Sequence, residues 1–234
     1  FYHLLPYFHE IHFEGAEIYS QRSAKGVITI AGIPIDSSPS DYTAQNWLFS
    51  QDLIEAKQVK LNWDDKLNQK TPTLIEVQDL SLVNGIRRHT GSLIVTTPWN
   101  EGPAEVKVNF AHHLGGQTGN WRDWIGSVSW NINNLNLKKI ANEFQLKLSS
   151  LEGVLSSKGN LKIDNAHPDG GEFFVAVDKL VVQLSKSEDA IALGRLETNL
   201  LQETEDGLIT ISTKFLKLFK GSISTKNLSE FLNN

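Results

Sequence analysis

Apolar and polar residues alternate one by one over long stretches of this chain. Val106, Val108 and Phe110, for example, are separated by Lys107 and Asn109. A period of two is typical of a β-strand with one apolar and one polar face. Turn-forming residues such as Asn-Gly, Gly and Pro end each stretch. The first five strands predicted in this way are 53–64, 73–83, 86–97, 104–113 and 124–134.

The same pattern continues to the end of the chain. The later strands predicted are 144–150, 159–164, 172–184, 190–201 and 208–223. The first forty residues predict strands at 8–19 and 27–35. Short helices are predicted after an N-cap at Ser40 or Asp41, over 136–143, and over 227–233.

Five strands followed by a short helix, twice, predict an internal repeat of architecture. Residues 136–142 and 227–233 match in pattern at an offset of 91 residues. The division expected is therefore the end of a preceding unit with a short helix (1–50), a five-strand unit with its helix (51–143) and a second such unit (144–234).

The links between strands are short, which favours antiparallel neighbours, since parallel strands need a crossover of a dozen residues or more. The short helices are too few to cover a sheet of this size. A single layer leaves its apolar face open unless the sheet curls or meets a second sheet. Two architectures follow: a mostly β, curled antiparallel sheet that forms an elongated apolar groove, and a closed β-sandwich acting as a binding or adhesion module.

Composition narrows the function classes. The chain has 234 residues, 40% hydrophobic and 21% charged, with a net charge of −5, which disfavours a nucleic-acid partner. It has no Cys, so thiol chemistry, disulfides and Cys-ligated zinc are excluded. No apolar stretch reaches the roughly 18 residues of a membrane-spanning helix. Because the sequence opens at Phe1 rather than Met, we treat it as a piece of a longer polypeptide.

The histidines are the only candidates for a metal site, and His89, His112 and His113 form the best cluster. Adjacent residues on a strand point to opposite faces, so one metal rarely binds both members of the 112–113 pair. A solvated strand end is the favoured interpretation, and no metal or cofactor is expected.

Other candidate functional residues also have ordinary structural explanations. Trp121, Trp124 and Trp130 suit a sugar-stacking platform, but large amphipathic rings more often fill an apolar face. Arg87 and Arg88 are of the residue type that binds phosphate bidentately, but such a pair more often marks a solvated strand edge. No pair of carboxylates, phosphate loop or nucleophile elbow is recognisable. We therefore expect no enzyme.

The middle of the chain carries a family resemblance. A Trp-Leu-x-x-Gln helix end is followed by a strand that closes in Trp-Asp-Asp, then by a Pro-led strand, an Arg-Arg-His run and a strand that closes in Thr-Pro. These motifs are Trp47 to Gln51, Trp63 to Asp65, Pro72 with Val77-x-x-Leu80, Arg87 to His89, and Thr97-Pro98. From about residue 40 onward the chain resembles the bacterial YhdP family of AsmA-like envelope proteins, and the later part adds Trp124-x-Gly126 and Leu135-x-Leu137.

The resemblance implies a repeating β-groove fold, anchored by an upstream helix in the inner membrane and extending across the periplasm. It implies a phospholipid partner, which such proteins carry toward the outer membrane along an apolar floor. Both membranes would be reached through parts outside this sequence.

The alternation then supplies the expected residues of the groove floor. They are Val59, Leu61, Trp63, Ile75, Val77, Leu93, Val95, Val106, Val108, Phe110, Val128, Trp130, Ile132, Leu146, Leu148, Leu161, Ile163, Val175, Val177, Leu180, Val182, Leu184, Ile191, Leu193, Ile209 and Ile211.

Overall fold

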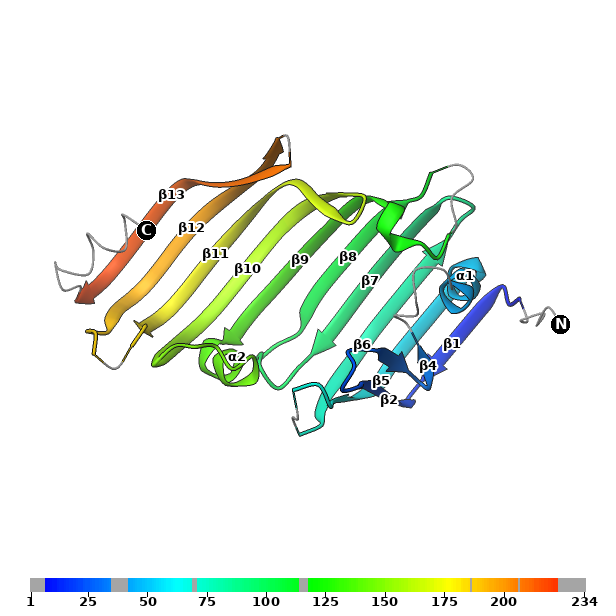
Figure 1. The fold of residues 1–234 in the computed structure, drawn as a ribbon, viewed down its shortest axis with the longest axis horizontal. Helices are drawn as coiled ribbons and strands as arrows, with labels where there is room; N and C mark the ends of the chain where they lie inside the picture. Colours follow the sequence, from blue (N-terminus) through cyan, green and yellow to red (C-terminus); the bar gives the residue numbers. More distant parts are fainter. Residues whose placement is uncertain are drawn as a thin grey trace. The chain divides into compact units, whose positions relative to one another are not determined.

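The computed structural model describes residues 7–34, 42–68, 71–113, 118–185, 187–205 and 207–222, and Figure 1 shows the course of the chain. The strands are β1 (Glu10–Glu14), β2 (Glu17–Arg22), β3 (Ile28–Ile30), β4 (Ile33–Pro34), β5 (Leu53–Asp65), β6 (Thr73–Asn84), β7 (Arg88–Thr96), β8 (Ala104–Ala111), β9 (Ile125–Asn136), β10 (Ser150–Asp164), β11 (His167–Gln183), β12 (Ile191–Glu205) and β13 (Leu208–Ser222). The helices are α1 (Thr43–Ser50), the 3-10 helix η1 (Trp121–Asp123) and α2 (Leu137–Glu143).

The predicted fold class is confirmed in its main points. The protein is mostly β, with 66% of the described residues in strands, and the helices described are few and short. All the strands belong to one sheet, which is not closed into a barrel. None of the helices described is long and apolar enough to span a bilayer.

Strand order follows the sequence over most of the sheet. The hydrogen-bonded order is β4-β3-β2-β5-β6-β7-β8-β9-β10-β11-β12-β13, and β1 pairs with β5 as well (Figure 1). From β5 onward each strand therefore pairs with the next one along the chain, as short turns dictate.

The prediction that all neighbouring strands are antiparallel is wrong at β5. Both β1 and β2 run parallel to β5, with Ile11 opposite Ile54 and Ile18 opposite Leu61. The connection from Arg22 to β5 includes β3, β4 and α1. That length is sufficient for the crossover that parallel neighbours need.

The chain divides into two compact units, and each is described by itself. Unit 1 comprises Phe1–Pro98, Pro103–Ser129 and Leu161–Asp169. Unit 2 comprises Trp99–Gly102, Trp130–Asn160 and Gly170–Asn234. The predicted division at 51–143 and 144–234 stays a prediction.

The five strands predicted between residues 53 and 134 are confirmed as β5 to β9. The strand predicted over 8–19 is two strands, because the chain breaks at Gly15, which has a φ of 62°. The strand predicted over 27–35 is the pair β3 and β4. The N-cap predicted at Ser40 or Asp41 and the helix predicted over 227–233 lie outside the described residues.

The strand predicted over 144–150 is wrong. Helix α2 begins where predicted, with the Asn136 side chain accepting a hydrogen bond from the Lys139 N–H at 3.0 Å. At its C-terminus the Phe144 N–H donates to the Ile140 carbonyl, and Gln145 has a φ of 49°. The residues after α2 therefore form a turn. Strand β10 starts only at Ser150 and includes the strand predicted over 159–164, so β10 to β13 are four strands rather than five.

Candidate functional site: the apolar face of the sheet

In unit 1 the strand register brings the predicted floor residues onto one face. Val59 lies opposite Val77, and Val77 lies opposite Val95. Leu93 in turn lies opposite Val106. Partners directly opposite each other project from the same side of a sheet. The predicted residues that share this side, called the apolar face below, are Val59, Leu61, Trp63, Ile75, Val77, Leu93, Val95, Val106, Val108 and Phe110.

The apolar face of unit 1 continues onto β9. A methyl group added to Gly126 would lie 2.6 Å from the Phe110 ring, so this position is on the Phe110 side of the sheet. Val128 is two residues further along the same strand and shares that side.

In unit 1 this face also includes apolar residues that the sequence prediction omitted. Ile54 and Ala56 are buried, and they lie opposite Leu82 and Leu80. The simple alternation from Val59 assigns these residues to the polar side. Two irregularities interrupt this alternation and bring the residues onto the apolar face. Gln58 on β5 has a left-handed φ of 53°, and the β6–β7 register shifts between Val77 and Asp79.

In unit 2 the β11–β12 register gives the same result. Val177 lies opposite Leu196, Leu180 opposite Leu193, and the left-handed φ of 54° at Lys179 lies between them. The predicted residues paired across these strands are Val175, Val177, Leu180, Val182, Ile191 and Leu193. Sequence reasoning missed Leu196 and Leu200 on β12 and their partners Leu218 and Thr213 on β13.

The remaining predicted residues divide by position. Ile209 and Ile211 lie on β13 opposite Thr204 and Gln202. Along β9 and β10, a methyl group added to Gly159 would meet Trp130 and Phe173, so Gly159 is on the Trp130 side. By alternation, Ile132 is on the same side of β9 as Trp130. Leu161 and Ile163 are on the same side of β10 as Gly159. Three predicted residues lie outside the strands: Leu146, Leu148 and Leu184.

The apolar face is only partly covered. Among the residues described, eight hydrophobic side chains are buried, and Val59, Val177 and Leu193 are the three of them that were predicted as floor. Ile209 and Ile211 are 52% and 62% exposed. Most other predicted residues are half-buried. Sheets in globular domains normally bury such a face under another layer, so in both units this face is available to a further apolar component.

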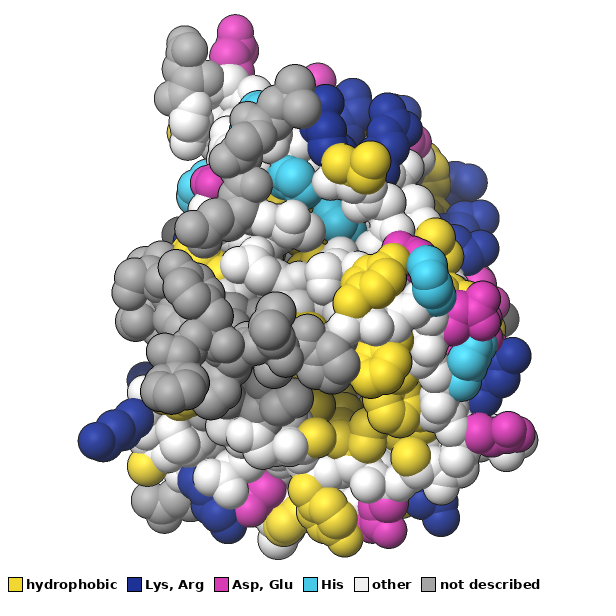
Figure 2. Space-filling view, turned by 90° about the vertical axis from the view of Figure 1, so that its right-hand side faces the viewer, with side chains coloured by type: hydrophobic (Ala, Val, Ile, Leu, Met, Phe, Trp, Pro, Cys, Tyr) yellow, Lys and Arg dark blue, Asp and Glu magenta, His cyan; other side chains and the backbone are white. Residues whose placement is uncertain are grey.

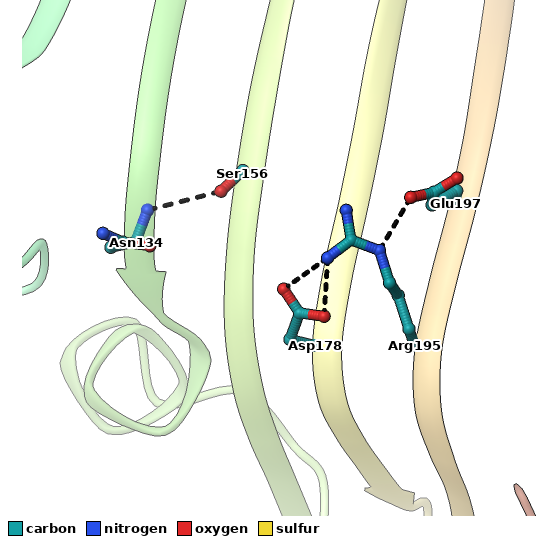
Figure 3. A network of polar contacts seen from close by, with 5 residues as sticks. All are labelled: Asn134, Ser156, Asp178, Arg195 and Glu197. Carbon is teal, nitrogen blue, oxygen red and sulfur yellow. Dashed lines mark hydrogen bonds and ion pairs between the residues drawn. The ribbon is translucent and has the colours of Figure 1, made fainter. Parts of the chain in front are cut away.

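The opposite face of unit 2 carries charged side chains next to apolar ones such as Phe174 and Val181. On β11 and β12 of unit 2, Arg195 lies between two carboxylates, donating from Nη1 to Asp178 at 2.8 and 2.9 Å and from Nε to Glu197 at 2.7 Å (Figure 3). The hydrogen bonds to Glu197 and Asp178 raise the pKa of Arg195, and the bond to Glu197 has the larger effect. Figure 3 also shows the Asn134 N–H donating to Ser156 Oγ.

An open hollow of about 860 Å³ is present in unit 2. Its lining includes Asn131, Lys158, Asn160, Glu172 and Asn199. Amide and charged side chains of this kind need polar partners. Trp130 and Phe174 also line the hollow, so its lining is mixed, and the candidate site remains the apolar face.

One end of the apolar face in unit 1 is closed by α1 and by the segment before β9. The His89 ring stacks on Trp124 at 5.0 Å and on His112 at 5.6 Å, and Phe49 of α1 meets both His89 and Trp124 edge-on. His89 is 1% exposed, and its Nδ1–H donates to Asn84 Oδ1 at 2.8 Å. This group is called the His89 stack below.

The interpretation of His89 and His112 as a solvated strand end is therefore wrong, because both are buried. Burial, and secondarily the charge of His112, lower the pKa of His89 to about 4. Within the described part of the chain, no group of three or more His, Asp or Glu side chains is arranged to hold a metal ion.

The other end of these strands carries a buried ion pair. Arg22 donates from Nε to Asp65 Oδ1 at 2.9 Å, and the Asp65 side chain is only 5% exposed. The hydrogen bond from Arg22 is the main reason why the pKa of Asp65 falls to about 2, and Asn68 assists. The pair joins the parallel strands β2 and β5.

We expect Arg22→Ala to lower the midpoint of urea unfolding, because it leaves the Asp65 carboxylate buried without its cation. In the wild type, the stability due to this pair is present above pH 3.8 and is lost as the pH falls toward 2. The control is Lys66→Ala, which removes the exposed pair of Lys66 with Asp64. Equal midpoints for the two variants would contradict a structural role for the Arg22–Asp65 pair.

Comparisons with known proteins identify no relative: no family model, no curated protein and no solved structure matches this chain.

Proposed function

We propose that this chain is a section of a lipid-conducting bridge in the periplasm, which carries phospholipid acyl chains along the apolar face of its sheet between the inner and outer membranes. The observation that carries this proposal is that the apolar face stays half-open in both units while its residues line up across neighbouring strands. The resemblance of the chain from about residue 40 onward to YhdP-type envelope proteins supports the location and the partner.

The energetics of the cargo agree with such a face. Removing an acyl chain of about sixteen methylenes from a bilayer into water costs roughly 13 kcal/mol, at ~0.8 kcal/mol per methylene. Within each unit, the apolar partners on neighbouring strands would offset this cost. The face is open on one side, so a charged headgroup can remain in water while the acyl chain is bound.

The alternative of a closed β-sandwich needs a second sheet to cover the apolar face. Every strand described belongs to one sheet. No observation therefore favours the sandwich over the lipid-conducting bridge.

A matched pair of variants on β8 tests the proposal. Val108 is half-buried on the apolar face, whereas its neighbour Lys107 is exposed on the polar face. We expect Val108→Asp to reduce co-purified phospholipid at least tenfold, because a carboxylate in the floor must be desolvated when an acyl chain covers it.

The measurement is native mass spectrometry of the protein purified in mild detergent, with circular dichroism as the check on the sheet. Lys107→Asp should bind lipid like the wild type. The proposal fails if folded Val108→Asp retains its phospholipid, or if the wild type carries none.

A further inference from the structure

The turn between β6 and β7 exposes an apolar side chain beside two cations. Ile86 is 95% exposed, and Arg87 and Arg88 follow it directly. Together with Gly85 and Ala111 these residues line an open hollow of about 550 Å³. Figure 2 shows a hydrophobic side chain next to Lys and Arg side chains at the top of the molecule. An almost fully exposed isoleucine in a turn gains nothing from the fold of unit 1.

Further exposed aromatic residues lie at the same end of these strands. Trp121 is 47% exposed, and the Arg122 guanidinium lies 4.8 Å from its ring centroid. Phe8 is 45% exposed, and its N–H donates to Gln51 Oε1 just before β5. The name Ile86 rim is used below for residues 7–8, 85–88 and 121–122, all in unit 1.

The rim is basic, although the whole chain has a net charge of −5. It contains three arginines, Arg87, Arg88 and Arg122, and two carboxylates, Asp52 and Asp123, lie beside it. Asp52 pairs with His9 at 2.8 Å, and Asp123 accepts a hydrogen bond from Asn120. Guanidinium groups bind phosphate oxygens well.

We infer that the Ile86 rim docks on the surface of an anionic phospholipid bilayer. This inference rests on the proposed function, and it adds a bilayer contact within this chain to the membrane contacts expected outside it. Arginines at the headgroup level, aromatic rings at the interface and one apolar tip that enters the acyl region are the features that bind proteins to such surfaces. A site for free phosphate would use the arginines and have no need of Ile86, Phe8 or Trp121.

Vesicle co-sedimentation of the full chain tests the inference. We expect binding to vesicles of phosphatidylcholine mixed with phosphatidylglycerol and much weaker binding to phosphatidylcholine alone. Each of Arg87→Gln and Arg88→Gln should weaken binding about fivefold, the equivalent of ~1 kcal/mol per basic residue at an anionic surface. Added salt should weaken it further.

The matched control for the apolar tip is Leu208, which is 70% exposed at the β12–β13 turn beside Glu205. Ile86→Asp should abolish sedimentation with the vesicles, whereas Leu208→Asp should leave it unchanged. The inference is overturned if Ile86→Asp binds like the wild type, if both vesicle types bind equally, or if inorganic phosphate displaces the protein completely.

The two proposals fail separately. Val108→Asp should lose co-purified phospholipid and still sediment with anionic vesicles, because the rim is intact. Ile86→Asp should keep any phospholipid that the wild type already carries. If the wild type binds vesicles but carries no phospholipid, the docking of the Ile86 rim on a bilayer is supported and the lipid-conducting function is refuted.

Discussion

Replacing His89 with Ala is expected to destabilise the protein by about 3 kcal/mol. The ring is 1% exposed and is held between Trp124 and His112, so its removal leaves a cavity in the middle of the stack. The substitution also leaves Asn84 Oδ1 without the donor that now lies 2.8 Å away. Phe49 of α1 loses a ring partner in addition, so the closed end of the apolar face should loosen.

The same residue makes stability depend on pH. The pKa of His89 is about 4 in the folded protein and 6.5 in the unfolded chain. Between these pH values the unfolded chain binds a proton at His89 that the folded protein does not bind. The free energy of unfolding therefore falls as the pH is lowered from 6.5 to 4. Below pH 4 this residue causes no further change in stability. The loss is on the order of 3 kcal/mol. The structural reason is that His89 Nε2 is buried and has no hydrogen-bond partner, so a proton added there has no acceptor.

Urea unfolding at pH 7 and at pH 4.5 measures both effects. His89→Phe keeps a ring in the stack but cannot titrate, so its stability should change less between the two pH values than that of the wild type. His113→Ala is the control, because His113 is exposed beside the stack, and it should stay within about 0.5 kcal/mol of the wild type. A His89→Phe protein with the full pH dependence of the wild type would show that another group is responsible.

Much of the candidate site is predictable from the alternation alone. Val59, Val77 and Val95 are far apart in the sequence, yet they meet because each of these strands pairs with the next. Register in a sheet with one apolar face is fixed by that face, since a slip of one residue would turn every side chain to the wrong side. The period of two therefore predicts β5 to β8, and also which of their residues lie together.

The parts that were not predictable depend on single backbone conformations and on long-range contacts. Gln58 and Lys179 adopt left-handed φ values, and near them the apolar spacing changes from two to three. Neither residue is a Gly, so the residue type does not predict the left-handed conformation. The Val77-x-x-Leu80 spacing is the local sign in the sequence that the apolar period changes. The His89 stack joins α1, β7 and the segment before β9, and no short-range pattern links these segments.

Gly126→Ala is expected to cost about 3 kcal/mol or more, through a clash that no side-chain movement relieves. A methyl group at this position would lie 2.0 Å from the Asn109 carbonyl oxygen and 2.6 Å from the Phe110 ring. The oxygen belongs to the backbone of β8, so β8 and β9 must separate to admit it. This separation would interrupt the apolar face between Phe110 and Val128.

Gly102→Ala is the matched control, because a methyl group there meets nothing within 4 Å. It should unfold at nearly the same urea concentration as the wild type, whereas Gly126→Ala should unfold much earlier. If the two variants unfold at the same concentration, β8 and β9 do not approach as closely as described. Under the proposed function, Gly126→Ala that remains folded at low temperature should also carry less phospholipid than Gly102→Ala, because the apolar face would be interrupted between β8 and β9.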